Sequence, residues 1–159
     1  MVESTFLKCH FCNRMKKFVL NLIIYLMIVG GLVFGLPRLL SWGLNTPYPM
    51  AAITSGSMWP VLNEGDLVFI QGVPRESLKV GNVIVFRNDG GPGFTIHRIV
   101  ELGANNLTTK GDANFDNDSP VKYENVVGRA LTWGKDPVHI PYLGSITVMA
   151  NNLREEKTK

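Results

Sequence analysis

Cysteine is nearly absent from this chain of 159 residues. The only two, Cys9 and Cys12, lie near the N-terminus, so residues 13–159 cannot form a disulfide among themselves. With His10 between them, they supply three candidate zinc ligands, one fewer than a structural zinc site needs. We therefore interpret them as two reduced thiols in a tail.

Charged residues are also scarce. Asp, Glu, Lys and Arg make up 18% of the chain, whereas a soluble domain usually carries about 25%. Hydrophobic residues make up 45%, and the mean hydropathy is slightly positive at +0.09. This balance excludes a disordered chain and indicates that part of it lies in lipid.

The net charge of +3 does not come from the bulk of the sequence. Four of the 16 basic residues and one of the 13 acidic residues lie in residues 1–17, so residues 18–159 hold 12 of each. A nucleic-acid-binding module would spread its basic residues over a folded face. The position of the charge argues against nucleic acid as a partner.

One long apolar run follows the basic cluster. It covers 18–36, FVLNLIIYLMIVGGLVFGL, and Asn21 is its only strongly polar residue. As a helix its 19 residues would extend for about 28 Å, close to the thickness of the hydrocarbon core of a bilayer. A helix buried in so small a domain would rarely be apolar on every side, so we predict a membrane span.

The run is longer than the apolar core of a cleaved signal peptide, and no Ala-x-Ala site follows it. We therefore predict an anchor that is not cleaved, with the basic flank in the cytoplasm. The predicted parts are a cytoplasmic basic tail (1–17), a transmembrane anchor (18–36), an interfacial linker (37–49) and an extracytoplasmic domain (50–159). Trp42 and Tyr48 suit an aromatic belt at the outer surface.

Beyond residue 50, short runs rich in β-branched residues alternate with Gly, Asn and Asp. They predict strands over 67–70, 82–86, 94–102, 107–110 and 126–133, and a helical pattern only over 145–156. This punctuation is typical of antiparallel sheets. The expected fold is mostly β: one N-terminal transmembrane helix followed by a compact antiparallel β domain.

Candidate catalytic groups are a serine and two histidines in the extracytoplasmic part. Ser57 lies in the tight segment SGSMWP (55–60), and a serine on such a turn becomes a nucleophile only beside a base. His97 lies within a predicted strand and His139 near the C-terminus. Strand alternation does not decide whether His97 faces Ser57.

An acidic cluster over 111–118 places side-chain oxygens at alternate positions, as a calcium loop does. It fails the EF-hand pattern, because Asn117 stands where Gly is needed and Tyr123 where Glu is needed. Asp112 is explained as part of an Asx-type turn after Gly111 or, alternatively, as a carboxylate that orients the imidazole of His97 and stabilises its cation. We expect no metal and no cofactor.

Taken together, these segments resemble signal peptidase I. The matching blocks occur in that family's order behind the anchor: SGSMWP (55–60), GDLVFI (65–70), GNVIVFR (81–87), IHRIV (96–100) and KGDANFDND (110–118). Histidine at position 97, where the main bacterial branch has lysine, makes the chain similar to the archaeal and endoplasmic-reticulum-type branch.

The resemblance implies a role for each matching residue. Ser57 would be the nucleophile and His97 the general base. We expect Asp118 to complete the triad and Asp112 to be a carboxylate that shapes the site, although the resemblance leaves open which of the two holds His97. The oxyanion hole would be formed by the backbone N–H of Ser57 and the hydroxyl of Ser55.

The implied activity is that of a membrane-anchored serine endopeptidase that cleaves signal peptides from exported preproteins. Its expected partners are preproteins with small residues at −3 and −1, membrane lipid and the secretion translocon. We expect the plasma membrane rather than the endoplasmic reticulum. Two alternatives remain: a non-catalytic anchored β module that binds an extracytoplasmic partner, and a related peptidase with one dedicated substrate.

Overall fold

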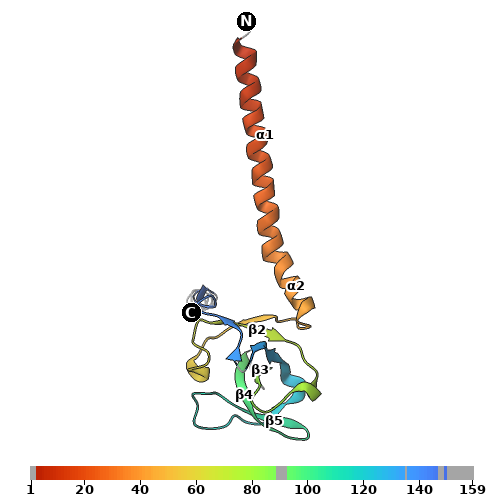
Figure 1. Cartoon of the computed structure of the whole chain (residues 1–159), viewed down its shortest axis with the longest axis vertical. Coiled ribbons are helices and arrows are strands. Elements are labelled where there is room, and N and C mark those ends of the chain that lie inside the picture. The colour runs from red at the N-terminus through yellow and green to blue at the C-terminus, as the bar shows by residue number, and fades with distance from the viewer. Residues whose placement is uncertain (1–2, 89–92, 135, 147–148, 150–159) are drawn as a thin grey trace, which may run out of the picture. The chain divides into compact units, whose positions relative to one another are not determined.

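The computed structural model of the chain describes residues 3–88, 93–134, 136–146 and 149, with side chains from residue 14 onward. Its contacts divide it into two compact units, Met1–Leu40 and Ser41–Lys159. The first unit is helical and the second is mostly β (Figure 1).

The N-terminal helical segment contains α1 (Glu3–Gly30), the π-helical turn η1 (Gly31–Gly35) and α2 (Leu36–Gly43). It extends beyond the predicted span of 18–36 at both ends. Pro37 does not end the helix: the helical path continues through it to Gly43, directly after the π-helical turn. The N–H of Leu36 bonds to the carbonyl of Gly31, which closes the wide turn.

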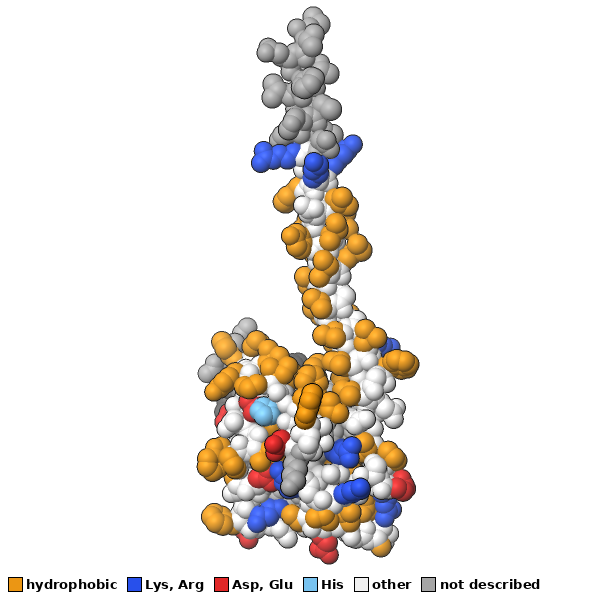
Figure 2. Space-filling model, in the orientation of Figure 1, with side chains coloured by type: hydrophobic (Ala, Val, Ile, Leu, Met, Phe, Trp, Pro, Cys, Tyr) orange, Lys and Arg blue, Asp and Glu red, His pale blue; other side chains and the backbone are white. Residues whose placement is uncertain are grey.

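This helix is the one element of the described residues that is long and apolar enough to cross a membrane, over Arg14–Gly43. None of the apolar window is buried by the protein. Exposed hydrophobic side chains follow one another along the helix, as over 22–29, and Figure 2 shows them on its visible face, with basic side chains at the start of the described part. An apolar surface on every side is what a lipid-facing helix requires.

The second unit is built on a curled antiparallel sheet of eight strands (Figure 1). Its order is β1-β2-β7-β3-β4-β5-β6, and β10 also pairs with β2. The strands are β1 (Met50–Ala52), β2 (Leu67–Gln71), β3 (Val83–Arg87), β4 (Phe94–Leu102), β5 (Asn106–Lys110), β6 (Val121–Lys122), β7 (Val126–Ala130) and β10 (His139–Ile140). A separate ribbon joins β8 (Thr132–Trp133) to β9 (Asp136–Pro137), and single 3-10 turns form η2 (Gly56–Met58), η3 (Arg75–Ser77) and η4 (Tyr123–Asn125).

The mostly β fold class is confirmed, and the principal strands lie within a residue or two of the predicted ranges. The single strand expected over 126–133 is divided at Leu131, whose N–H bonds to the carbonyl of Phe69 and whose carbonyl accepts from the N–H of Val138. The short strands β6, β9 and β10 were not predicted, because two residues carry no periodicity. The helix expected over 145–156 lies mostly outside the described residues.

β3 lies between the two hydrophobic cores of this unit. Val83 belongs to one core, with Ile53, Met58, Leu62, Val68 and Ala130. Ile84 and Phe86 belong to the other, with Leu78, Ile99, Leu107 and Val121. Because successive side chains of a strand point to opposite faces, a strand that is buried on both faces reads as a continuous apolar run. Burial of each such side chain stabilises the fold by about 1.5–3 kcal/mol.

Candidate active site

Ser57 lies in the 3-10 turn η2, directly after β1. The N–H of Trp59 bonds to the carbonyl of Gly56 and closes the turn. Met58, the next residue, is fully buried in the first core. The turn is thus anchored by a core side chain, while the Ser57 hydroxyl remains beside open space.

His97 enters the site from the middle of β4. It pairs with Ile84 of β3, and this register fixes the position of His97 along the strand direction. Its side chain is 9% exposed, and its ring lies 6.5 Å from that of Phe86 in an edge-on arrangement. A histidine held this closely has little freedom to leave the position that its partners define.

Ser57, His97 and Asp118 form a continuous hydrogen-bonded line. The distance between Ser57 Oγ and His97 Nε2 is 3.1 Å, and that between His97 Nδ1 and Asp118 Oδ2 is 2.5 Å. An ionised carboxylate only accepts hydrogen bonds. Nδ1 therefore carries the proton, and Nε2 is left to accept from the Ser57 hydroxyl. This is the arrangement in which a serine is activated by a neighbouring base.

Asp118 is held in place from β5. The fully buried hydroxyl of Thr109 donates to the same oxygen, Asp118 Oδ2, over 2.7 Å. The N–H of Asp118 bonds to the carbonyl of Thr109. Nothing in the local sequence of Thr109 marked it as part of the site, because its role depends on the turn that brings 118 back to 109.

Asp112 does not contact His97; it pairs with Arg98. The guanidinium donates from Nε to Asp112 Oδ1 over 2.8 Å and from Nη2 to Oδ2 over 2.6 Å. A third bond joins Arg98 Nη1 to the carbonyl of Gly81. The hydrogen bonds that Arg98 donates to Asp112 raise the pKa of the guanidinium above its ordinary value, although burial acts in the opposite direction. Asp112 therefore holds the loop through its contact with Arg98 and does not orient His97.

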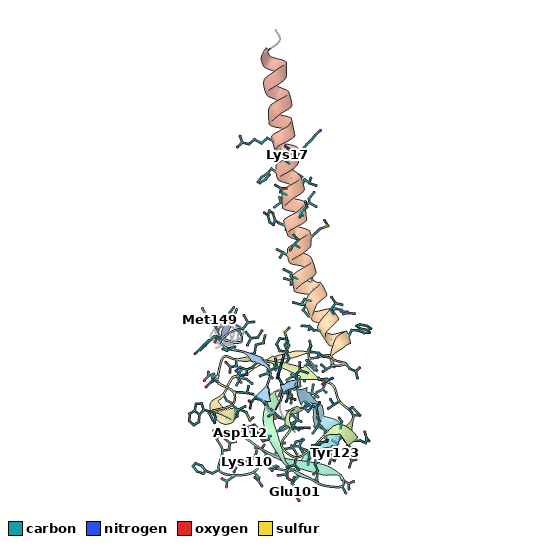
Figure 3. All side chains as sticks on the ribbon, in the orientation of Figure 1. Lys17, Glu101, Lys110, Asp112, Tyr123 and Met149 are labelled. Atoms are coloured by element: carbon teal, nitrogen blue, oxygen red, sulfur yellow. The ribbon has the colours of Figure 1, made fainter. Side chains whose placement is uncertain are left out.

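The loop after β5 lies against the turn that carries Ser57. Figure 3 labels Lys110, the last residue of β5, and Asp112, which lies close beside it. The N–H of Ala113 bonds to the carbonyl of Ser57 over 2.9 Å. Gly111 has no room for a side chain, because a Cβ there would lie 2.7 Å from the Ser57 carbonyl oxygen.

The other predicted residues are placed as follows. Ser55 Oγ lies 3.2 Å from Ser57 Oγ, so the two hydroxyl groups are within hydrogen-bonding distance. His139 is elsewhere: it faces the buried Asp66 at 3.7 Å, and its Nδ1 lies 3.1 Å from the carbonyl of Pro137. The side chains of His10, Cys9 and Cys12 lie outside the described ones.

An open cleft of about 870 Å³ lies beside Ser57 and His97. Residues of β1 and of the first half of β4 line it, over a floor that includes Ile53, Met58, Ile70, Val85 and Val127. In the described part of the chain, β1 pairs with β2 alone, and β4 pairs with β5 only from Arg98 onward. The cleft therefore has a free main-chain edge on each side.

No family model matches the chain. Curated proteins do match it. It is 33% identical over 118 residues to the signal peptidase complex catalytic subunit SEC11 of Pyricularia oryzae, covering 69% of this chain and 68% of that protein. With the corresponding subunit of Sclerotinia sclerotiorum it shares 32% identity over 117 residues, at the same coverage.

The similarity extends to mammals. The chain is 29% identical over 117 residues to the human signal peptidase complex catalytic subunit SEC11C. The match covers 65% of this chain and 58% of the human protein, so the chain spans less than two thirds of the length of that relative.

Proposed function

The chain belongs to the family of signal peptidase catalytic subunits, and on that premise we propose that it is a membrane-anchored serine endopeptidase that removes signal peptides from exported preproteins. The observation that carries this proposal is the line from Ser57 Oγ through His97 to Asp118, beside an open cleft that β1 and the first half of β4 line.

Acylation begins at Ser57. Its hydroxyl donates its proton to His97 Nε2 while Oγ forms a bond to the scissile carbonyl carbon. The carbonyl π bond opens and leaves an oxyanion. Asp118 stabilises the imidazolium that forms and keeps its Nδ1 proton directed away from the substrate.

The oxyanion needs donors that are already in place. The backbone N–H of Ser57 and the hydroxyl of Ser55 are the proposed pair, since Ser55 Oγ lies 3.2 Å from the attacking oxygen. One such donor typically contributes about 3–4 kcal/mol to the stability of the transition state.

Collapse of the tetrahedral intermediate breaks the C–N bond, and His97 returns its proton to the leaving amine. The mature protein departs with a new N-terminus. Water then enters, gives a proton to His97 and attacks the acyl-enzyme. Ser57 is regenerated when His97 protonates it, so the enzyme ends each cycle unchanged.

Substrate would bind as a strand between β1 and the first half of β4. The free edges of these strands offer main-chain groups to an extended peptide. Alternate side chains of a strand point to one side, so residues −1 and −3 would both face the apolar floor. Small side chains at these two positions fit such shallow subsites.

The basic flank of the anchor supports an N-terminus in the cytoplasm and a catalytic unit outside it. The apolar helix fits a single-pass membrane protein, and a plasma membrane with the secretion translocon nearby is our preferred setting. A membrane anchor raises the effective concentration of the catalytic site relative to scissile bonds that emerge at the same membrane surface.

Cleavage of a model preprotein in membranes tests the function. Wild type should release the mature protein with one defined new N-terminus, read by sequencing, and Ser57→Ala should release none. Ser77→Ala is the control, because its hydroxyl bonds only within its own turn, to the carbonyl of Pro74. Cleavage by Ser57→Ala at the wild-type rate would contradict the proposal.

The two cysteines allow a separate test of orientation. Because both lie before residue 13, a thiol reagent that does not cross membranes should label the protein in cells only after permeabilisation. A Glu101→Cys variant with both native cysteines replaced by serine should be labelled without it. The opposite pattern would reverse the proposed orientation.

A further inference from the structure

Asn114 lines the cleft together with Ser57 and His97, and the catalytic steps above do not use it. Its side chain is half-buried. Its backbone N–H bonds to the carbonyl of Gly111, but among the described residues its side-chain amide makes no hydrogen bond. A polar group that is partly withdrawn from water without a protein partner is available to a ligand.

The amide lies beside the nucleophile. A Cβ on Gly111 would lie 2.7 Å from the carbonyl oxygen of Ser57 and 2.7 Å from Asn114 Nδ2. Since both atoms are 2.7 Å from one point, their separation is at most twice that distance, 5.4 Å. The absence of a side chain on Gly111 is what lets Asn114 come this close.

The geometry also indicates which part of a substrate passes Asn114. The oxyanion is directed to the N–H of Ser57 and to Ser55, whereas Asn114 lies near the carbonyl at the other end of the Ser57 residue. The leaving nitrogen must reach His97 Nε2 to be protonated. The chain beyond the scissile bond therefore starts on the Nε2 side of His97, in the cleft that Asn114 lines together with Ser57.

We propose that Asn114 binds the main chain of the leaving segment, the first residues of the mature protein. This assignment rests on the proposed peptidase function. A primary amide has both donors and an acceptor, so it matches the alternating N–H and C=O groups of an extended peptide. Such a contact does not depend on side chains, so it positions the leaving segment without restricting its sequence.

The test compares acylation, in which the leaving segment is still part of the substrate, with deacylation, in which it has already departed. Acylation of the full-length protein in lipid vesicles is measured with two peptides, one with five residues after the scissile bond and one with a single residue there. Deacylation is measured with an ester of the same acyl segment, because its acyl-enzyme carries no leaving segment. Asn117→Ala is the matched control, being an exposed asparagine of the same loop.

Asn114→Ala should lower the acylation rate constant kcat/KM for the long peptide by about 3- to 10-fold, the usual effect of one lost hydrogen bond. The short peptide and the deacylation rate should be unchanged, as should both peptides with Asn117→Ala. Asn114→Asp, which keeps the shape but loses the N–H donors, should behave like Asn114→Ala.

Other outcomes overturn the assignment. If Asn114→Ala slows deacylation as well, the amide serves the oxyanion or holds the loop, because both roles are needed in both steps. Equal losses on the long and the short peptide exclude contact with the leaving segment. No loss on either peptide, with wild type active and Ser57→Ala inactive, refutes the assignment alone. A wild-type protein that cleaves neither peptide contradicts the proposed function, and this assignment with it.

Discussion

The carbonyl oxygen of Ser57 accepts a hydrogen bond from the N–H of Ala113 over 2.9 Å. This bond joins the nucleophile turn to the loop that carries Asp118, 61 positions further along the chain than Ser57. The same loop is held at its start by the Arg98–Asp112 pair and at its end by the bonds between Asp118 and Thr109. The relative position of Ser57 and Asp118 therefore depends on how this loop is packed.

Gly111→Ala tests that packing. The added methyl group would lie 2.7 Å from the Ser57 carbonyl oxygen, a backbone atom that cannot move without moving the nucleophile. We expect a loss of kcat of at least about tenfold, since small displacements of a catalytic group are costly. Gly43→Ala, at the end of α2 and outside the turn that carries Ser57, is the control, because a Cβ there has no neighbour within 4 Å. Equal activity of the two variants would show that the loop does not position Ser57.

Asp118→Asn should remove most of the activity while leaving the fold intact. An amide at this position no longer favours the proton on His97 Nδ1, so Nε2 is not kept free to accept from Ser57. The loss of kcat expected from the wrong tautomer is about 10³- to 10⁴-fold. Asp116→Asn, an exposed residue of the same loop, should retain wild-type activity. A similar loss of activity in Asp116→Asn would show that the loss arises from the net charge of the loop and not from the contact between Asp118 and His97.

Asp112→Asn and Arg98→Lys should lower stability more than chemistry. Each variant breaks a bidentate, largely buried ion pair, and we expect the free energy of unfolding to fall by about 1–3 kcal/mol. Thermal unfolding of both single variants and the double variant gives their coupling energy. If Asp112→Asn instead matched Asp118→Asn in activity at unchanged stability, Asp112 would belong to the reacting group.

Ser55→Ala should lower kcat with little change in KM, because an oxyanion donor acts in the transition state and not on the bound substrate. A loss of about 10²-fold is expected from one such donor. Ser55→Thr keeps a hydroxyl near Ser57 Oγ and should recover most of that activity. A rise in KM at constant kcat would identify Ser55 as a substrate-binding residue and remove it from the oxyanion hole.

Much of this molecule follows from local properties of the sequence. A run of 19 residues that is apolar apart from Asn21, beside a basic flank, defines a helix that can cross a membrane, because length and hydropathy decide that without reference to other elements. The strand at Phe94–Leu102 was predicted at its observed bounds, since nine residues rich in β-branched and aromatic side chains have few alternatives. The two-residue strands and Thr109 gave no such signal.

The sequence alone did not determine which acidic residue contacts each histidine. Residue type alone left both His97 and His139 as candidate bases, and the family resemblance, which pointed to His97, left open whether Asp112 or Asp118 holds it. Only the tertiary structure places His97 and Asp118 together, turns Asp112 to Arg98, and leaves His139 near Asp66. Ser57 is 40 residues from His97 and Asp118 is 21 from it. Contacts at such separations are set by strand register and by the turn of the loop over 111–118, and neither is encoded in the pattern of any one segment.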